Sequence, residues 1–458
     1  MVTKGELDMS ERTYYPLNIS QKILAFSLKF VPKKELMNIC SEIEFTRELD
    51  AKLMLQALTL GLMRSPSASM RMHLNENKEI VQYFSDAAPE KIDYLDYTGK
   101  TEAELNNDYA KWSRTAFPNK HMDTQLYMAK LIKKPNGNLA IYSSFSHLIA
   151  DSYAIMQIHK EIVDIYVSLE KGEALPPVSQ GPIAAYEADY KYLASDKSKD
   201  DVAYFDKCVF DNAPQFTTIM GKDSKAFNKN KRYGNMNKSL LMKGAVLALP
   251  FEKGLDDKVM KYATEHKVSP QSLYVLAIRT FLSKVCEVED VTLNNSIARR
   301  ATIAQKKGGG TMVNGVVVRF RFGNNVSFSD GCAQTYEGLC TNYRHANATY
   351  EDASSFEMKF KPNSLKAFTS LGISYQPYLF LNENFPFKYR HISNGRQAQS
   401  LYITILPFDS EGTLGIDYDY QVGWTSEEAI RSLHKFIQDF LNAGLAAPDK
   451  TLAELMKN

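Results

Sequence analysis

A histidine and an aspartate four positions apart are the residues of this sequence best suited to chemistry. His147 follows a stretch that alternates like a strand, and Asp151 comes directly before a stretch with helical periodicity. Because the ordinary pKa of histidine lies near neutrality, an imidazole at a strand end could take a proton from an amine or hydroxyl that attacks an acyl carbonyl. The spacing alone also fits a histidine that is only hydrogen-bonded.

Other patterns typical of catalysis or ligand binding are missing from the sequence. The remaining histidines, His121 among them, stand apart from one another, and His159 is expected to pack on a helix. No H-E-x-x-H metal motif, G-x-S-x-G nucleophile elbow, Walker loop or G-x-G-x-x-G motif occurs. The glycine-rich stretch Lys306–Gly310 lacks the G-K-[ST] ending and is interpreted as a surface or cleft loop. We therefore expect no metal site and no phosphate cradle.

Hydrophobic periodicity and turn residues predict the strands that lead to His147. A strand is expected over Met37–Phe45. Gln125–Ile132 and Leu139–Phe145 flank the sequence Lys-Lys-Pro-Asn-Gly and predict a hairpin. The second strand of that hairpin alternates in the manner of a half-buried strand.

A helix is expected directly after the histidine and aspartate. Isoleucines recur at helical spacing over Tyr153–Leu169. Asp151 or Ser152 can cap its start, and Gly172 can end it. The free N–H groups of this helix would then lie close to the histidine.

The later part of the chain again mixes strands with helices, without a repeat at the residue level. Between the two parts we expect a helix over Ala184–Leu193, a polar break over Ser195–Asp201 and a basic loop over Lys222–Arg232. Further strands are predicted over Ala245–Leu249, Met312–Phe322, Ser400–Leu406 and Thr413–Gln421, and further helices over Gly254–Glu265, Ser269–Val285 and Ser426–Leu441. The pattern predicts a two-lobed α/β (or α+β) protein, with lobes over 1–180 and 181–458 and a crossover at about 181–245.

The composition supports a globular chain with two lobes and excludes several functions. Its 458 residues are too many for one ordinary core. With 55 Lys and Arg against 53 Asp and Glu, the net charge of +2 gives no reason to expect nucleic acid binding. The basic loop is read as solvated surface, or as a docking patch for an acidic partner. Five cysteines without a C-x-x-C pair favour a reducing, cytoplasmic location, and no apolar run predicts a signal peptide or a membrane span.

Several short segments around His147 match a known set of motifs in order. Ser146-His147-Leu148-Ile149-Ala150-Asp151-Ser152 is similar to H-H-x-x-x-D-G. The other matches are Tyr15–Gln21 with P-L-T-x-x-Q, Arg64–Arg71 with R-H-x-x-L-R, Tyr186–Tyr190 with Y-x-D-Y, Tyr204-Phe205 with Y-W, Ala298–Arg300 with A-x-R, and Gly310–Arg319 with G-x-F-V-N-T-x-x-x-R. Through them the chain resembles the condensation domains of nonribosomal peptide synthetases, within the chloramphenicol acetyltransferase-like superfamily.

The resemblance implies a fold and a division of roles. Two acetyltransferase-like lobes would form a V-shaped pseudo-dimer with a central tunnel. His147 matches the histidine at the reacting centre, and Asp151 matches a structural aspartate that pairs with an arginine of the second lobe, for which Arg300 is the candidate. Ser146 replaces the motif's first histidine and Ser152 replaces its glycine, which affects rate and substrate fit. Ser146, Ser152 and Asn314, which lies fourteen residues after the arginine, are the supporting residues.

The resemblance also implies substrates and partners. The donor would be an acyl or aminoacyl thioester on the phosphopantetheine arm of an acyl or peptidyl carrier protein, and the acceptor a small amine or alcohol. No permanently bound cofactor is expected. The sequence has no adenylation or carrier motif, so we expect a stand-alone, monomeric condensation enzyme.

Two alternatives remain open from the sequence. The first is a related acyltransferase that uses a free acyl-CoA, because the superfamily shares the H-x-x-x-D chemistry. The second is a non-catalytic recruitment module of the same fold, an interpretation that rests on Ser146 and Ser152.

Overall fold

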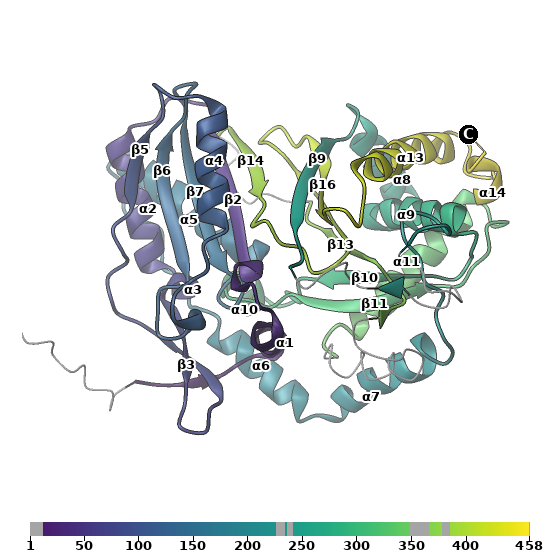
Figure 1. Cartoon of the computed structure of the whole chain (residues 1–458), viewed down its shortest axis with the longest axis horizontal. Coiled ribbons are helices and arrows are strands. Elements are labelled where there is room, and N and C mark those ends of the chain that lie inside the picture. The colour runs from purple at the N-terminus through teal and green to yellow at the C-terminus, as the bar shows by residue number, and fades with distance from the viewer. Residues whose placement is uncertain (1–11, 226–233, 236–240, 349–365, 378–384, 458) are drawn as a thin grey trace, which may run out of the picture.

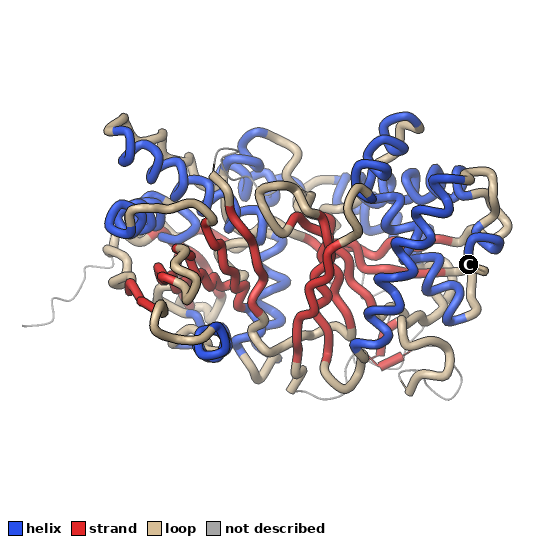
Figure 2. The backbone as a smooth tube through the Cα atoms, turned by 90° about the horizontal axis from the view of Figure 1, so that it is seen from above, coloured by secondary structure: helices blue, strands red, loops and turns tan. Residues whose placement is uncertain are grey.

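The computed structural model describes residues 12–225, 234–235, 241–348, 366–377 and 385–457. Two mixed sheets lie side by side, and helices cover the outer side of each (Figure 1). Seen from above, the strands of the two sheets form two separate groups (Figure 2). This arrangement agrees with the predicted α/β, two-lobed class. The central tunnel and the boundaries at residues 180 and 181 stay predictions.

The first sheet contains the strands that lead to His147. Its order is β14-β2-β7-β6-β5, with bounds Phe387–Ile392, Asn38–Phe45, Leu139–Ser146, Tyr127–Lys133 and Asp93–Asp96. β6 and β7 form the predicted antiparallel hairpin. A smaller sheet, β1-β4-β3, lies beside it, with bounds Tyr15–Pro16, Ile80–Phe84 and Met70–Leu74.

The prediction that the second hairpin strand is half-buried is wrong, because β7 is buried along its whole length. Ile141 and Phe145 belong to the main core of this lobe, which includes residues of α2 (Ala51–Arg64) and α5 (Ser152–Lys171). On the opposite face, Tyr142 stacks on Tyr109 of α4 (Glu102–Ser113). Helices therefore cover both faces of the strand, a feature that alternation within one strand does not reveal.

The second sheet has the order β11-β10-β13-β15-β16-β9, and its core is built with long helices. The strand bounds are Asn314–Phe320, Val291–Ile297, Leu371–Tyr375, Leu401–Pro407, Leu414–Gln421 and Gly244–Pro250. The helices are α8 (Leu255–Glu265), α9 (Pro270–Cys286), α11 (Phe328–Arg344) and α13 (Glu427–Ala446). The core of this lobe joins the apolar residues of β15 and β16 to those of α9 and α13.

Helices α6 (Ile183–Leu193) and α7 (Asp196–Tyr204) run along the lower edge of both lobes (Figure 1). The predicted polar break over Ser195–Asp201 is therefore wrong, since most of it is helical. Lys197 pairs with Asp201 one turn later, and Asp201 also accepts a hydrogen bond from the Tyr192 hydroxyl. Charged residues satisfied in this way are compatible with a helix.

One strand crosses between the two parts of the chain. β14 comes from the later part, yet it pairs with β2 of the first sheet in antiparallel register. The Tyr389 N–H of β14 also donates to the Phe408 carbonyl, just beyond β15 (2.7 Å). β14 thus ties the edge of the first sheet to the second lobe.

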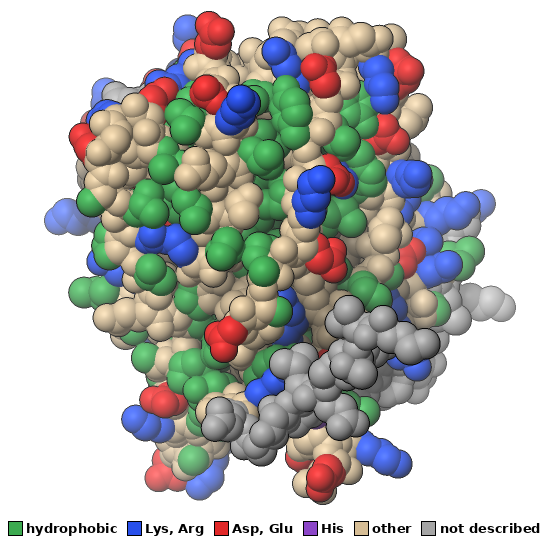
Figure 3. Space-filling view, turned by 90° about the vertical axis from the view of Figure 1, so that its left-hand side faces the viewer, with side chains coloured by type: hydrophobic (Ala, Val, Ile, Leu, Met, Phe, Trp, Pro, Cys, Tyr) green, Lys and Arg blue, Asp and Glu red, His purple; other side chains and the backbone are tan. Residues whose placement is uncertain are grey.

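The surface reflects the balanced composition. On the face shown in Figure 3, Lys and Arg side chains are mixed with Asp and Glu between apolar patches. Among the described residues, no helix is both long and apolar enough to cross a membrane.

Candidate active site

His147 lies at the point where β7 ends, and contacts from both lobes hold its backbone. Its N–H donates to the Met37 carbonyl of the first lobe (2.7 Å). Its carbonyl accepts from the Thr311 hydroxyl of the second lobe (2.6 Å). The position of the imidazole is therefore set jointly by the two lobes.

The environment keeps the His147 imidazole neutral. Burial lowers its pKa below the ordinary value, while the Asp151 carboxylate and the residue's own backbone group raise it by less. Its Nδ1 is buried and forms no hydrogen bond with any described residue. Nε2 is the other ring nitrogen, and a neutral imidazole has one nitrogen that can accept a proton.

Asp151 links the start of α5 to the second lobe. Its carboxylate caps the helix by accepting from the Ala154 N–H (2.9 Å). It also accepts from Arg300 Nη2 at 2.8 and 2.9 Å, and from the N–H groups of Met312 (2.8 Å) and Val313 (3.2 Å). With every oxygen occupied, this carboxylate has an architectural position rather than a free face for a substrate. As predicted, Gly172 ends the same helix in the left-handed conformation.

Arg300 binds both Asp151 and the glycine-rich loop, and so connects them. Its guanidinium donates to the carbonyls of Gln305 (2.7 Å), Gly309 (3.0 Å) and Gly310 (2.7 Å), and it lies over the Tyr153 ring. Gly310 has a φ of 70°, and an added Cβ there would collide with the Tyr186 hydroxyl. The end of this stretch is therefore held against Asp151 through Arg300, while Lys306 and Lys307 are exposed at the surface, as predicted.

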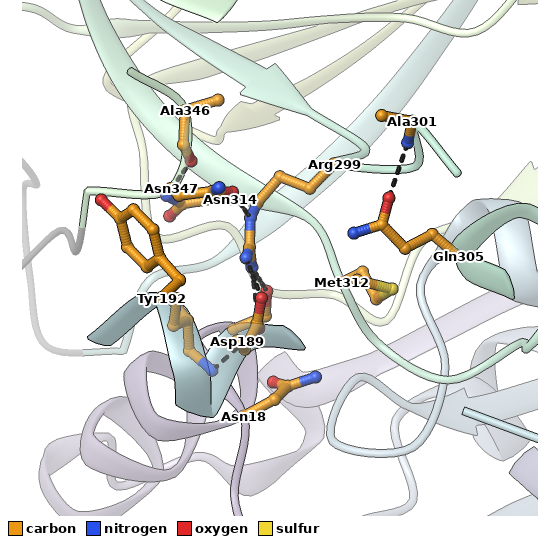
Figure 4. A network of polar contacts seen from close by, with 12 residues as sticks. Asn18, Asp189, Tyr192, Arg299, Ala301, Gln305, Met312, Asn314, Ala346 and Asn347 are labelled. Carbon is orange, nitrogen blue, oxygen red and sulfur yellow. Dashed lines mark hydrogen bonds and ion pairs between the residues drawn. The ribbon is translucent and has the colours of Figure 1, made fainter. Parts of the chain in front are cut away.

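The neighbouring arginine makes a second ion pair between the lobes, which the sequence reasoning missed (Figure 4). Arg299 has a φ of 54°, which turns its side chain away from that of Arg300. Its guanidinium pairs with Asp189 of α6 (Nη1 to Oδ2 3.2 Å) and donates to Asn347 (2.8 Å). Both members of the pair are buried. The aspartate of the Y-x-D-Y segment was the one signal in the sequence for this contact.

Ser146 has a histidine partner that the sequence reasoning treated as isolated. Its hydroxyl shares a 3.0 Å hydrogen bond with Nδ1 of His121, and both residues are fully buried. Burial, with a smaller effect of Lys34, lowers the pKa of His121 to about 4, so the ring is neutral. An imidazole from another segment thus lies against the position where the motif has its first histidine.

The other two supporting residues have structural surroundings. Ser152 is the first residue of α5 and does not have a positive φ, so its backbone does not need glycine. Asn314 is buried at the start of β11, and its amide donates to the carbonyls of Ala346 (2.8 Å) and Ala348 (2.7 Å). It braces the segment that follows α11.

In the described part of the chain, side chains that could bind a metal ion lie scattered. Among the described residues, no cluster of three or more His, Cys, Asp or Glu side chains is placed to hold a metal ion. The five cysteines are free thiols.

Comparison with known proteins gives matches along nearly the whole chain. The family model described as "Condensation domain" matches residues 11–457. Surfactin synthase subunit 1 of Bacillus subtilis (strain 168) is 24% identical over 451 residues, which cover 97% of this chain and 12% of that protein. Enterobactin synthase component F of Escherichia coli O157:H7 is 26% identical over 200 residues, 42% of this chain and 15% of that protein. The chain therefore spans less than a fifth of the length of these curated relatives.

Solved structures share the fold. The first condensation domain of the calcium-dependent antibiotic synthetase, in complex with a substrate analogue, superposes with a TM-score of 0.82 at 18% identity, covering 96% of this chain and 99% of that one. VibH, described as an NRPS condensation enzyme, gives a TM-score of 0.72 at 16% identity, with 95% and 98% coverage. These similarities confirm the acetyltransferase-like fold expected from the sequence.

Proposed function

This chain belongs to the condensation-domain family, and from that membership we propose that it joins an acyl or aminoacyl group, held as a phosphopantetheine thioester, to an amine. Amide-bond-forming condensation is the activity that goes with the family. We place His147 at the reacting centre. The donor would arrive on an acyl or peptidyl carrier protein, and a hydroxyl acceptor would give an ester instead. Stand-alone action, a monomeric state and a cytoplasmic location stay predictions.

The observation that carries this proposal is the neutral imidazole of His147, fixed between the lobes by Met37 and Thr311. A neutral imidazole can take the proton that an amine must lose when it becomes an amide. Its fixed backbone limits the orientational freedom that would otherwise raise the barrier.

The proposed step transfers one proton while one bond replaces another. The amine nitrogen attacks the thioester carbonyl, the carbon–nitrogen bond forms, and the carbon–sulfur bond breaks. His147 takes a proton from the attacking nitrogen, or positions that nitrogen and stabilises its charge. The proton ends on the departing thiol, so the step needs no other reactant.

The surroundings of the two serines favour catalysis over a purely recruiting role. Ser146 is hydrogen-bonded to His121, and Ser152 occupies an ordinary helical position. Neither departure from the motif therefore disturbs the loop that carries His147.

An acyl-CoA is the second candidate donor, because it offers the same phosphopantetheine thioester. The starter condensation domain of rhizomide synthetase, in a variant bound to C8-CoA, has a TM-score of 0.79 with this chain at 15% identity and 96% coverage of both chains. Parallel assays with an acyl carrier and the matching acyl-CoA separate the two donors.

The test compares His147→Ala with wild type, using an octanoyl carrier protein, octanoyl-CoA and a panel of amines, with product measured by mass spectrometry. We expect a loss of turnover of about 10²–10⁴-fold, the usual contribution of a positioned acid or base. The matched control is His266→Ala, which changes the exposed histidine directly after α8. This variant should remain active. Undiminished turnover in His147→Ala would refute the role assigned to this residue.

A further inference from the structure

Two aspartates on β16 face away from the core of the second lobe. On this strand Ile416, Tyr418 and Tyr420 pack into the lobe's core. Side chains of a strand alternate between its faces, so Asp417 and Asp419 lie together on the opposite face. Asp417 is only 4% exposed. The pair therefore lies on the face of the sheet opposite the core, where Asp417 is buried and Asp419 is partly exposed.

The face of the second sheet that carries these aspartates is turned toward the first lobe. In the sheet register Asp417 lies opposite Thr404, and Asp419 lies opposite Tyr402, whose hydroxyl donates to Ser296 (2.7 Å). Burial first, and then the nearby Asp417 carboxylate, raise the pKa of Tyr389 on β14. Since β14 belongs to the first sheet, Asp417 faces that sheet where the two lobes meet.

The described residues supply no positive charge for this pair. Among the described residues, neither carboxylate has a Lys, Arg or His within ion-pair distance. Asp417 has no hydrogen-bond donor there, and Oδ1 of Asp419 is buried without a partner, although the Gln397 side chain serves its carboxylate. Burial raises the pKa of Asp417 to about 7. Burial also raises the pKa of Asp419. Both carboxyl groups therefore favour the protonated form, and a cation beside them would favour the carboxylates.

A cation that fits these two carboxyl groups would have the chemistry of an organic ammonium rather than that of a metal ion. Two carboxylates without further His, Cys, Asp or Glu ligands do not form a metal cluster among the described residues. An ammonium group can donate to both carboxylates and to the Tyr402 or Thr404 hydroxyls beside them. A guanidinium could do the same.

We infer that Asp417 and Asp419 form a subsite for a positively charged group on a substrate of the condensation reaction. This inference rests on the proposed function. The amine that attacks the thioester must be neutral, so the charge bound here belongs to a second amino or guanidino group. The preferred substrate is then a diamine or polyamine acceptor, or a donor whose acyl group has a basic side chain.

The test uses Asp417→Asn, Asp419→Asn and the double variant, which keep the shape and remove the charge. Condensation is measured with one carrier-bound donor and two matched acceptors, 1,3-diaminopropane and propylamine. A third arm pairs lysyl and norleucyl donors with propylamine. The exposed Asp439→Asn on α13 is the control for loss of an acidic charge.

We expect the double variant to raise KM about 10- to 100-fold for the substrate with the second charge and to leave the uncharged analogue unchanged, as loss of charge-assisted hydrogen bonds predicts. The acceptor and donor arms show which substrate carries that charge. Equal effects on charged and uncharged substrates in both arms, or none, would overturn the subsite.

A binding measurement keeps this failure distinct from failure of the proposed function. Calorimetric titration of the unmodified protein with 1,3-diaminopropane needs no turnover. Binding that disappears in the double variant supports the subsite even if no amide forms. Turnover of propylamine in a protein whose charged-substrate preference ignores both aspartates supports the proposed function and rejects the subsite.

Discussion

Replacing Asp151 by asparagine removes one charge from a buried ion pair and leaves the other behind. Arg300 is 2% exposed and Asp151 4% exposed, so water cannot replace the lost carboxylate without rearrangement. Asparagine keeps one oxygen, which can still cap α5 through the Ala154 N–H. It cannot also satisfy Arg300 and the N–H groups of Met312 and Val313.

The expected cost follows from these contacts. Breaking a buried ion pair from one side typically destabilises a protein by about 3–5 kcal/mol, because a buried charge is left unpaired. Against a usual total stability of about 5–15 kcal/mol, Asp151→Asn should lower the free energy of unfolding, the folded yield and the activity together. The loss of activity follows from release of the His147 loop.

Urea denaturation followed by circular dichroism measures this loss, alongside turnover of a loaded carrier. Asp439→Asn is the matched control, because it breaks an exposed ion pair with Lys435 one helical turn away and should cost about 0.5 kcal/mol or less. If Asp151→Asn were as stable as this control and yet inactive, the carboxylate would act directly in catalysis and the architectural reasoning would be wrong.

Three further predictions concern the surroundings of the site. Asp189→Asn should also cost about 3–5 kcal/mol in urea denaturation, because it leaves Arg299 buried without its charge partner; a cost near zero would contradict this. His121→Asn, whose amide can still bond to Ser146, should keep more of the wild-type kcat than His121→Ala at similar stability, and equal kcat values would count against a positioning role. Burial lowers the pKa of His121 and of His159 to about 4, so the unfolded chain binds more protons between pH 6.5 and 4; stability measured by urea denaturation should fall as pH falls through this window, and a flat profile would be inconsistent with neutral buried rings.

Local patterns were enough to predict the elements that carry the site. Turn residues and alternation predict the hairpin of β6 and β7, and capping residues predict the ends of α5. Each of these signals lies within or directly beside the element that it predicts. The polar stretch of α7 was misjudged, because its helix depends on contacts such as Asp201 with Tyr192 and His345. The pairing of β14 with β2 was not predictable, since it joins strands more than 300 residues apart.

The same distinction explains which site residues could be found. His147 and Asp151 lie in one short motif, whereas His121 reaches Ser146 only because its backbone adopts a φ of 71° in a tight turn. Such a conformation is rare for a residue other than glycine and has no clear sequence signal. The Asp189–Arg299 pair was hidden for a related reason, because nothing in the sequence shows that adjacent arginines turn in opposite directions.

The side chains of Arg299 and Arg300 point in opposite directions, and each forms a buried ion pair near the site. Arg300 pairs with Asp151 at the start of α5, and Arg299 pairs with Asp189 on α6. One short segment of the second lobe therefore contacts both helices. Thr311, eleven residues further on, binds the His147 carbonyl directly. Any shift of this segment relative to β7 would therefore move the imidazole and its helix together. Because the second lobe supplies both the support for His147 and the proposed Asp417 subsite, we expect a change in how the lobes pack to alter the proposed catalysis and the proposed charge recognition together.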